Sequence, residues 1–399
     1  MRVLVAVMAL TGTVARAQLP FGDDFESGNL SKWLVQDNPG VTIEASTLAA
    51  HRGTYGVRVV DTETVVEDTS AARVSKRINS TSQNLYQRVW FRVPSRNAAG
   101  GTLFFYADWE IAGSSWANAA GCNFDFEGKI FCGQQDPDNA QNINFKLGDA
   151  GWSVVDGGWS LFEALTAGRG TDAGWTVFAI DGRIAVRYFG LHANAQSFPS
   201  VEIGEVYNYD PGFMTVLDFD DPRYDVRPMA SRVNARVADT LHAGECGAIV
   251  LFLTATMPDV DGGTASSVAA PYSVEFVVEG ASVFSDDACS VAGSPVLDGG
   301  ATEVRAFVRP ATADPINVTV KHVGGDLLPS STSFTVLPAT AQPDGGGVDG
   351  GSSSSDGGVD DRSYYALQCG VGGAVPMMWI ALLALAARRR RSATSSRTS

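Results

Sequence analysis

Polar and hydrophobic residues alternate along much of the first half of the chain, as they do in β-strands that bury one face. Two segments show this pattern most clearly, Tyr86–Val93 and Leu103–Ile111. In the first segment, one predicted face carries Tyr86, Arg88, Trp90 and Arg92. In the second, one predicted face carries Phe104, Tyr106, Asp108 and Glu110. Each predicted strand therefore has one face that is rich in aromatic and charged side chains.

Turn signals join further strands into hairpins. Trp175–Phe189 is predicted to form two strands joined at Asp181-Gly182, a favoured two-residue turn. Cys122–Cys132 is predicted to fold back at Glu127-Gly128-Lys129, which places its two cysteines opposite each other. Only Trp159–Ala167 suits a helix, of two turns at most. Many short strands with glycine-rich turns predict an all-β sandwich or jelly roll.

The character of the sequence changes near residue 229. Residues 229–340 contain no tryptophan and have short, valine-rich predicted strands. These strands are Ala248–Thr256, Tyr272–Glu279, Glu303–Val308, Ile316–His322 and Ser333–Leu337. Their number and the length of the region predict a smaller immunoglobulin-like β-sandwich. Because the buried tryptophan usual in immunoglobulin domains is absent, the prediction concerns architecture and not family membership.

Both ends of the chain predict export. A basic start and an apolar run precede a small-x-small site that ends at Ala17, which predicts a signal peptide over residues 1–17. Residues 341–368 form a linker rich in Gly, Ser and Asp that cannot bury a core. The apolar run Ala374–Ala387 then ends at Arg388–Arg391. With its glycine-rich lead-in this run reaches about 17 residues, the short end of what spans a bilayer, and the arginines favour a cytoplasmic end.

Residues 369–399 resemble the myxobacterial C-terminal sorting signals known as MYXO-CTERM. The shared features are a preceding low-complexity linker, Cys369 in a glycine-rich setting, a short apolar helix and an arginine cluster. The resemblance implies processing near Cys369 and display on the cell surface. An ordinary C-terminal membrane anchor is the alternative. In either case we expect an exported protein, anchored at the cell surface or outer membrane through its C-terminus.

The chain is acidic, with a net charge of −15 from 29 basic and 44 acidic residues. Both predicted processed ends carry only positive charge, so removing their arginines leaves 22 basic residues and a net charge of −22. Such a surface repels nucleic-acid phosphates and anionic lipid headgroups. We therefore expect no nucleic-acid partner and favour neutral glycans, cations or basic partners. Solubility alone would also explain the acidity.

Five cysteines are present, four of them in the body of the chain. In an oxidising compartment an even set predicts disulfides, and proximity in sequence pairs Cys122 with Cys132 and Cys246 with Cys289. Cys369 is left over, in agreement with its predicted processing. No Cys/His spacing indicates a metal site.

Four motifs occur in an order that resembles the concanavalin A-like (laminin G-like) jelly rolls of secreted bacterial proteins. The motifs are Phe21–Trp33 (FGDDFESGNLSKW), His51–Val60 (HRGTYGVRVV), Val201–Glu205 (VEIGE) and Val216–Asp221 (VLDFDD). The resemblance implies a jelly-roll domain over residues 18–228, in which the last two motifs return beside the first strand. Pro222 departs from the family pattern, which usually continues a strand at that position.

The same resemblance implies a structural Ca²⁺. Many jelly-roll binding modules hold this ion between the first and last strands, through carboxylate and backbone oxygens. The matching positions are Glu26, the backbone near Gly53, and Asp220 or Asp221. Acidic residues that only shape turns are the alternative.

The mixed aromatic and charged faces predict a carbohydrate site, because sugars bind to aromatic rings and directed hydrogen bonds. If the strands Tyr86–Val93 and Leu103–Ile111 are neighbours, one surface collects seven candidate residues. These are Tyr86, Arg88, Trp90, Arg92, Tyr106, Asp108 and Glu110. The simpler alternative is that Trp90 and Tyr106 pack beneath a loop.

Catalysis is the competing hypothesis. Laminarinase-type glycosidases share this fold and carry a Glu-x-Asp-x-Glu run, which supplies two carboxyls about 5–5.5 Å apart. The chain has only Asp108-x-Glu110 and Asp125-x-Glu127, and neither completes the triplet. A lyase would need a Tyr or His base near Arg or Gln, but no lyase motif is recognisable around Tyr86, His51 or His192.

These patterns favour a non-catalytic, surface-anchored protein that binds an extracellular glycan or another surface ligand. A glycan hydrolase or lyase and a structural adhesion protein remain as alternatives. We assign no catalytic residue from the sequence.

Overall fold

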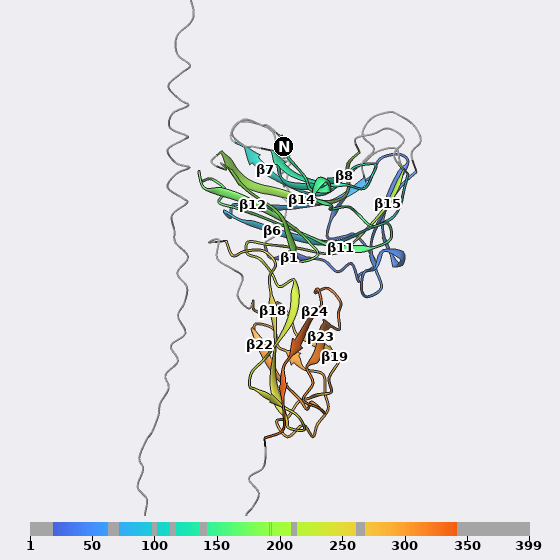
Figure 1. Cartoon of the computed structure of the whole chain (residues 1–399). Helices are drawn as coiled ribbons and strands as arrows, with labels where there is room; N and C mark the ends of the chain where they lie inside the picture. Colours follow the sequence, from blue (N-terminus) through green and yellow to red (C-terminus); the bar gives the residue numbers. More distant parts are fainter. Residues whose placement is uncertain are drawn as a thin grey trace, which may run out of the picture. The chain divides into compact units, whose positions relative to one another are not determined.

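The computed structural model describes residues 19–62, 72–97, 102–111, 117–135, 142–190, 192, 194–208, 214–260 and 268–340 (Figure 1). Within these ranges all regular secondary structure is β-strand, apart from the 3₁₀ turns η1 (Thr47–Ala49) and η2 (Leu147–Ala150). The predicted all-β class is confirmed. Trp159–Ala167, the one segment with a helix-like pattern, is strand β11.

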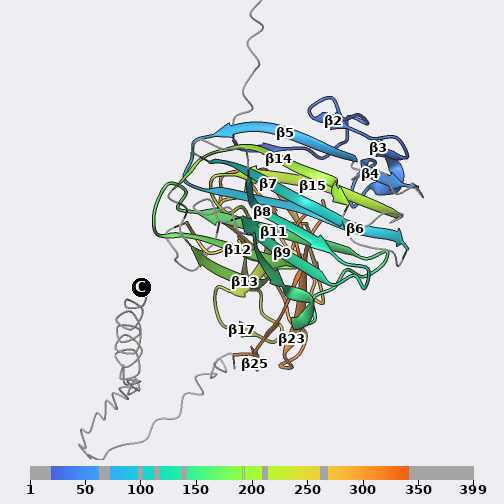
Figure 2. The same ribbon diagram turned by 90° about the horizontal axis from the view of Figure 1, so that it is seen from above.

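Residues 21–225 form a first sandwich of two antiparallel sheets. The eight-stranded sheet contains, in spatial order, β13 (Arg183–Gly190), β12 (Gly174–Ile180), β11 (Trp159–Ala167), β6 (Leu85–Arg96), β15 (Thr215–Asp225), β4 (Gly56–Asp61) and β3 (Val41–Ser46), with β1 (Phe21–Gly22) paired to β15. The seven-stranded sheet contains β10 (Asn142–Lys146), β9 (Ile130–Gln135), β8 (Ala117–Phe124), β7 (Thr102–Ile111), β14 (Ala195–Asn208), β5 (Ala72–Ser80) and β2 (Leu34–Gln36). In Figure 2 several strands of this second sheet, from β5 to β9, lie side by side. The chain crosses repeatedly between the sheets, which makes the sandwich jelly-roll-like, as predicted.

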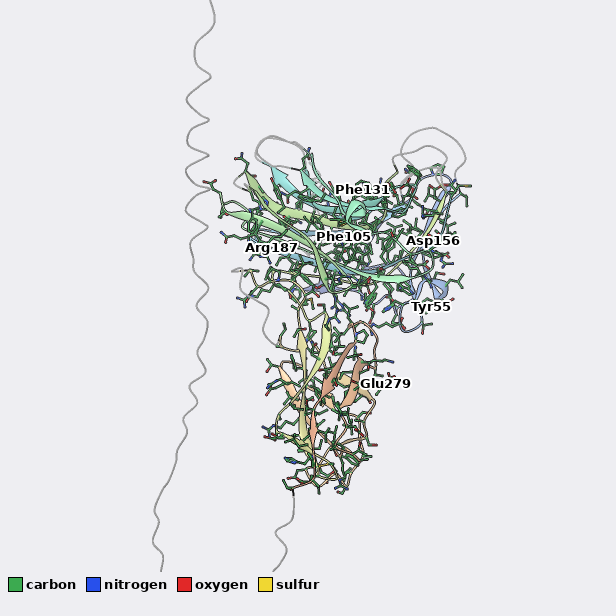
Figure 3. All side chains as sticks on the ribbon, in the orientation of Figure 1. Tyr55, Phe105, Phe131, Asp156, Arg187 and Glu279 are labelled. Carbon is green, nitrogen blue, oxygen red and sulfur yellow. A yellow bond between two sulfur atoms is a disulfide. The ribbon has the colours of Figure 1, made fainter. Side chains whose placement is uncertain are left out.

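The core of the first sandwich is aromatic and lies between its sheets. Phe91 of β6 stacks on Phe104 of β7 with ring centroids 4.0 Å apart, and both meet Phe162 of β11 edge-on. Phe105 lies in the same core (Figure 3). Burying each such side chain contributes about 1.5–3 kcal/mol, so these rings are a main reason why the sheets stay together.

The predicted alternation of β6 is confirmed, because Val89, Phe91 and Val93 face the core. In β7 the pattern holds only from Phe105 onward. Pairing with β8 shifts register between Leu103 and Phe105, and Phe104 joins the core instead of the opposite face. A bulge adds one residue to a strand and so changes which residues share a face.

Both predicted hairpins are confirmed. Asp181 and Gly182 have φ values of 49° and 73°, the positive values that a type I′ turn requires between β12 and β13. Between β8 and β9, Gly128 has φ 79° and the Asp125 carboxylate accepts hydrogen bonds from the backbone of Glu127 and Lys129. The register of this second hairpin places Cys122 directly opposite Cys132.

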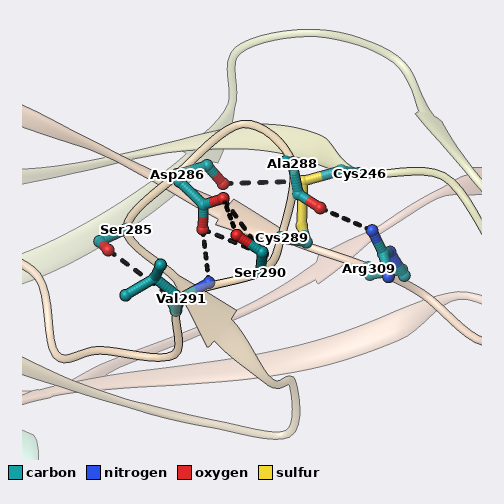
Figure 4. The surroundings of a disulfide bond; sticks show 8 residues. All are labelled: Cys246, Ser285, Asp286, Ala288, Cys289, Ser290, Val291 and Arg309. Atoms are coloured by element: carbon teal, nitrogen blue, oxygen red, sulfur yellow. Dashed lines mark hydrogen bonds between the residues drawn. A yellow bond between two sulfur atoms is a disulfide. The ribbon is translucent and has the colours of Figure 1, made fainter.

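Both predicted disulfides are confirmed. Cys122–Cys132 joins β8 to β9 within the core, and Cys246–Cys289 closes a loop of the second half of the structure. Figure 4 shows the second bond beside Asp286, whose carboxylate accepts hydrogen bonds from the backbone of Ser290 and Val291. These contacts fix the loop that presents Cys289 to its partner.

Residues 232–337 form a second sandwich with a core of its own. One sheet has the order β16 (Arg232–Val237), β18 (Gly247–Thr254), β22 (Glu303–Val308) and β20 (Val283–Phe284). The other has the order β21 (Val296–Leu297), β19 (Val274–Glu279), β23 (Ile316–His322) and β24 (Ser330–Phe334), and a parallel pair joins β17 (Leu241–His242) to β25 (Val336–Leu337). Strands occur in all five segments predicted for this region, with the last segment divided between β24 and β25.

The predicted signal peptide with Ala17, the linker and the sorting signal with Cys369 lie outside the described residues. In the described part of the chain, no helix has the length and apolar character needed to cross a membrane.

Candidate functional site

The seven residues predicted to bind a ligand do not form one surface. Those on β6 belong to the eight-stranded sheet, whereas those on β7 belong to the seven-stranded sheet. The assumption that these two strands are neighbours is therefore wrong. Strands that follow each other in sequence often pair, but here the chain crosses from one sheet to the other.

Three of the four β6 residues lie beneath the second sandwich, so their predicted role as a ligand surface is wrong. Tyr86, Arg88 and Trp90 expose only 0%, 1% and 6% of their surface. Tyr86 packs in one cluster with Met257, and Trp90 packs in another with Leu328. Alternation correctly gave the direction of these side chains, but it carries no information about what covers them.

Asp326 is the polar centre of this contact. Its backbone carbonyl accepts a hydrogen bond from Trp90 Nε1 at 3.2 Å, and its carboxylate accepts one from the Tyr272 hydroxyl and pairs with Arg88 at 3.4 Å. Burial by itself raises the pKa of Asp326, but the hydrogen bond with His322 and the charge of Arg88 hold it below its usual value. The result is a buried ionised carboxylate that joins the two sandwiches.

Arg92 is neutralised within the eight-stranded sheet. Arg92 and Arg58 both pair with Asp218 of β15, at N–O distances of 2.5 and 2.7 Å. The Arg92 guanidinium also lies 4.7 Å from the ring centroid of Trp159, a cation–π contact. These partners balance the charge of Arg92 within the first sandwich, so the residue has a structural role on this strand.

The residues predicted to hold calcium approach the same stretch of chain, but Glu26 is already engaged. Its Oε1 atom accepts hydrogen bonds from the backbone of Thr54 and Tyr55, at 2.8 and 2.9 Å. A side chain at Gly53 would collide with this carboxylate, at a Cβ–Oε1 distance of 2.5 Å. Glycine at this position thus allows the turn to close on Glu26.

The aspartate pair is engaged in the same way. Asp220 Oδ2 accepts hydrogen bonds from the backbone of His51 and Arg52, while both oxygens of Asp221 receive the Arg52 guanidinium at 2.5 and 2.6 Å. A hard cation needs such oxygens for itself. No group of three His, Cys, Asp or Glu side chains in the described ranges is placed to hold a metal. The structure therefore does not support the predicted calcium site: Asp220 and Asp221 fasten strand β15 to the turn at His51–Tyr55, and Glu26 accepts hydrogen bonds from the same turn.

The β7 residues lie on the outer face of the seven-stranded sheet, the face turned away from the core. Tyr106 is directly opposite Glu202 of β14, and Glu202 is opposite Ser75 of β5. Arg73 of β5 pairs with Glu202 at 3.3 Å. On its other side, Tyr106 is opposite Gly121 of β8, which has no side chain. We define the Tyr106 face as Arg73, Tyr106, Asp108, Ser200 and Glu202.

Serines of β14 hold the carboxylates of β7. Ser200 Oγ donates to Asp108 Oδ2 at 2.5 Å, and Ser197 Oγ donates to Glu110 Oε2 at 2.7 Å. Asp108 is buried, and it also forms a hydrogen bond with Tyr106. Glu110 is exposed. Asp108 therefore orients Tyr106, while Glu110 adds an exposed acceptor at the end of the strand.

The protonation of this face follows from its burial. Desolvation raises the pKa of Glu202 to about 7, with a smaller contribution from Asp108 and an opposing one from Arg73. Desolvation also raises the pKa of Asp108, against the hydrogen bonds from Ser200 and Tyr106. Burial and the neighbouring Asp108 raise the pKa of Tyr106 above its usual value. At neutral pH, Tyr106 is therefore a hydrogen-bond donor and Glu202 titrates.

The other catalytic candidates have structural partners. Asp125 shapes the β8–β9 turn, and Glu127 pairs with Lys129 at 2.5 Å. His51 stacks on Trp90 with ring centroids 3.9 Å apart, and burial lowers its pKa to about 4. His192 is fully buried beside Gln134 and the Ala167 carbonyl. These contacts leave the Tyr106 face as the candidate site.

Three residues of this face, Arg73, Ser200 and Glu202, were not among the sequence candidates. Glu202 lies within the VEIGE motif, where Val201 and Ile203 face the core. Alternation alone therefore places Glu202 outward. The sequence could not show which strands lie beside β14, because β14 pairs with β7 and β5, which are far from it in the chain.

No protein-family model matches the sequence, and no curated protein sequence matches it significantly. Solved structures that align with the chain include an endo-β-1,4-glucuronan lyase from the fungus Trichoderma reesei, at 14% identity and a TM-score of 0.40, over 52% of this chain and 94% of that one. The cellulose-induced protein Cip1 aligns at 17% identity and a TM-score of 0.39, over 52% and 97% of the two chains. Alginate lyase vAL-1 from Chlorella virus aligns at 11% identity and a TM-score of 0.37, over 51% and 96%. At TM-scores below 0.5 these alignments carry no argument about fold or function, which rest on the geometry of this chain.

Proposed function

We propose that this is an exported, surface-tethered, non-catalytic carbohydrate-binding protein, and that the Tyr106 face is its binding site. One observation carries the proposal: a fixed cluster of a partly exposed tyrosine, two carboxyls and a guanidinium on the outer face of a sheet. Sugars bind to such combinations of an aromatic ring and directed hydrogen bonds. Tyr106 supplies the ring, Glu202 an acceptor, and Arg73 the donors.

The proposal includes the setting of this site. The signal peptide is removed after Ala17, and the C-terminus is processed near Cys369 to display the protein on the cell surface. The second sandwich is immunoglobulin-like, and the linker 341–368 holds the folded part away from the membrane. Support for this setting comes from the sequence patterns at the two ends and from the strand-rich second sandwich.

Electrostatics favour binding over cleavage. A tyrosine that acts as the base of a lyase must first lose its own hydroxyl proton. Burial and the neighbouring Asp108 raise the pKa of Tyr106 and so oppose this loss. A retaining hydrolase needs a second carboxylate free to attack, yet Asp108 is held by Ser200 and Tyr106. Both groups are arranged to maintain fixed hydrogen bonds.

A glycan array probed with the full chain, with and without EDTA, tests this function. It includes glucuronan and alginate, the polysaccharides named in two structurally similar proteins. We expect binding that is insensitive to EDTA and that weakens at least about tenfold, or about 1.4 kcal/mol, in Tyr106→Ala. The matched control Phe126→Ala removes an exposed aromatic ring from the β8–β9 turn and leaves binding unchanged. A chain that binds no glycan contradicts the proposal and favours a structural adhesion role.

Product analysis of the same glycans separates binding from catalysis. The proposal expects no new reducing or unsaturated ends after prolonged incubation. Cleavage that is lost in Asp108→Asn or Glu202→Gln would instead identify the face as an active site.

A further inference from the structure

Strand β13 (Arg183–Gly190) forms an open edge of the eight-stranded sheet. It is the end strand in the sheet order, and its only partner among the described strands is β12. An edge strand presents unpaired N–H and C=O groups that can pair with an added strand. This edge belongs to the opposite sheet from the Tyr106 face, so a role for β13 does not depend on the proposed glycan site.

The hairpin holds this edge in a defined position. Asp181 in the β12–β13 turn accepts a hydrogen bond from the backbone of Leu161 at 2.8 Å, which ties the turn to β11. From the second sandwich, Arg232 Nη2 lies 3.4 Å from the Asp181 carbonyl oxygen, to which it donates. A preorganised edge loses less entropy when it binds an added strand than a flexible one does.

The outer side of β13 combines exposed apolar groups with a cation. Ile184, Arg187 and Phe189 are opposite Ala179, Val177 and Trp175, the residues of β12 that face away from the core. Phe189 is 68% exposed and Ile184 is 46% exposed. Arg187, labelled in Figure 3, is also exposed. It has no ion-pair partner within the described residues. The result is a row of two hydrophobic side chains with a free guanidinium between them.

Charge selects the partner. Residues 182–190 (GRIAVRYFG) contain two arginines and no acidic residue, in a chain whose net charge is −15. A second copy of β13 would bring four arginines onto one short ladder, between two strongly acidic molecules. Like charges opposite each other destabilise a strand pair, whereas opposite charges stabilise it. A strand with carboxylates facing Arg187 and hydrophobic residues beside Ile184 and Phe189 complements this edge.

We infer that β13 is a docking edge for an extended acidic segment of another protein, which adds to the eight-stranded sheet as a further strand. Backbone hydrogen bonds to the edge supply affinity, and the alternating side chains supply selectivity, as in other cases of β-strand addition. Charged residues on edge strands also serve to prevent association. That alternative predicts that no added strand binds.

The test uses the full chain and three peptides of about eight residues, in which valines lie opposite Ile184 and Phe189 and a glutamate, lysine or serine lies opposite Arg187; they are called the Val-Glu, Val-Lys and Val-Ser peptides. Hydrogen–deuterium exchange over residues 183–190 and calorimetric titration are measured with each peptide. We expect the Val-Glu peptide to slow exchange in β13 and to bind about tenfold more tightly than the Val-Ser peptide. The Val-Lys peptide does neither.

Charge reversal provides the matched pair of variants. The Arg187→Glu variant is expected to lose binding of the Val-Glu peptide and to gain binding of the Val-Lys peptide. Arg305 is an exposed arginine on the central strand β22, and Arg305→Glu should change the binding of neither peptide. Gain of a new ligand cannot result from misfolding. The inference is overturned if no peptide slows exchange in β13, if all three bind equally, or if Arg187→Glu leaves the preference unchanged. None of these outcomes affects glycan binding at the Tyr106 face.

Discussion

Glu202 illustrates how one residue acquires a special property from its surroundings. Its neighbours along β14, Val201 and Ile203, point into the core, so the carboxyl lies on the outer face between Tyr106 and Arg73. The residue is only 9% exposed, and loss of hydration disfavours the charged form. The ion pair with Arg73 opposes this effect but does not cancel it, since the pKa still rises to about 7.

This shift predicts a pH-dependent stability. The folded-state pKa of about 7 exceeds the ordinary value of 4.5, so the folded chain binds more protons than the unfolded chain between these values. Stability from this group is fully present below about pH 4.5 and is lost as the pH rises to about 7. Glu202→Gln mimics the protonated acid and removes the loss. The free energy of unfolding of the variant relative to the natural chain should therefore rise between about pH 5 and pH 8 in denaturant titrations.

Glu279→Gln is the control, because Glu279 is exposed and pairs with Lys321 across two strands. The difference in unfolding free energy between Glu279→Gln and the natural chain should change little with pH, as expected for a surface ion pair. If the Glu202→Gln difference is equally flat, Glu202 is ionised throughout this range and the burial argument fails.

At the scale of elements, local features were predictable and pairings between distant strands were not. Asp181-Gly182 and Glu127-Gly128-Lys129 define their hairpins within a few residues, and each places the strands that flank it. The direction of Trp90 on β6 was also a local property. That β6 and β7 lie in different sheets, and that Trp90 meets Leu328, depends on contacts across many residues. A single sequence contains no direct record of such contacts, so the predicted seven-residue surface failed where it relied on them.

The turn between β8 and β9 offers a test of one local feature. Gly128 and Gly151 have similar positive φ values, 79° and 86°, which are strained for any other residue except Asn or Asp. A Cβ atom at Gly128 would lie 2.7 Å from Arg96 Nη2 and 3.1 Å from Val154 Cγ2, whereas one at Gly151 meets nothing within 4 Å. Both Gly→Ala variants should lose about 1–2 kcal/mol to backbone strain. Gly128→Ala should lower the free energy of unfolding by roughly 1 kcal/mol more. The added Cβ would push Arg96 away, and Arg96 would then lose its hydrogen bond to the Phe126 carbonyl. If chemical denaturation gives equal losses of unfolding free energy for the two variants, Arg96 can move aside without destabilising the protein.

At the scale of the molecule, the two sandwiches have separate cores but share buried contacts. Tyr86 with Met257, and Trp90 with Leu328, form apolar clusters that include residues of both sandwiches. Arg88 adds a hydrogen bond to the Ala230 carbonyl at 2.5 Å. The second sandwich therefore covers part of the outer face of the eight-stranded sheet, where β6, β11 and β12 contribute to these clusters. This leaves the Tyr106 face and the β13 edge as the two surfaces of the first sandwich with candidate binding roles.

This arrangement predicts that the sandwiches unfold together and that Asp326 couples them. Asp326→Ala leaves the buried Arg88 without its counter-charge, and removing one partner of a buried pair costs about 3–5 kcal/mol. Replacing Arg88 by the apolar Met in the same chain removes that unpaired charge. The double variant Arg88→Met/Asp326→Ala should therefore be more stable than the sum of the single changes implies, by about 0.5–3 kcal/mol.

Calorimetry of the full chain should show one unfolding transition for the natural protein and two for Asp326→Ala. Glu303→Ala, which breaks the exposed pair with Arg236, should cost less than about 1 kcal/mol and keep a single transition. Strictly additive losses, or two transitions in the natural chain, would mean that the sandwiches are independent and that Asp326 does not couple them.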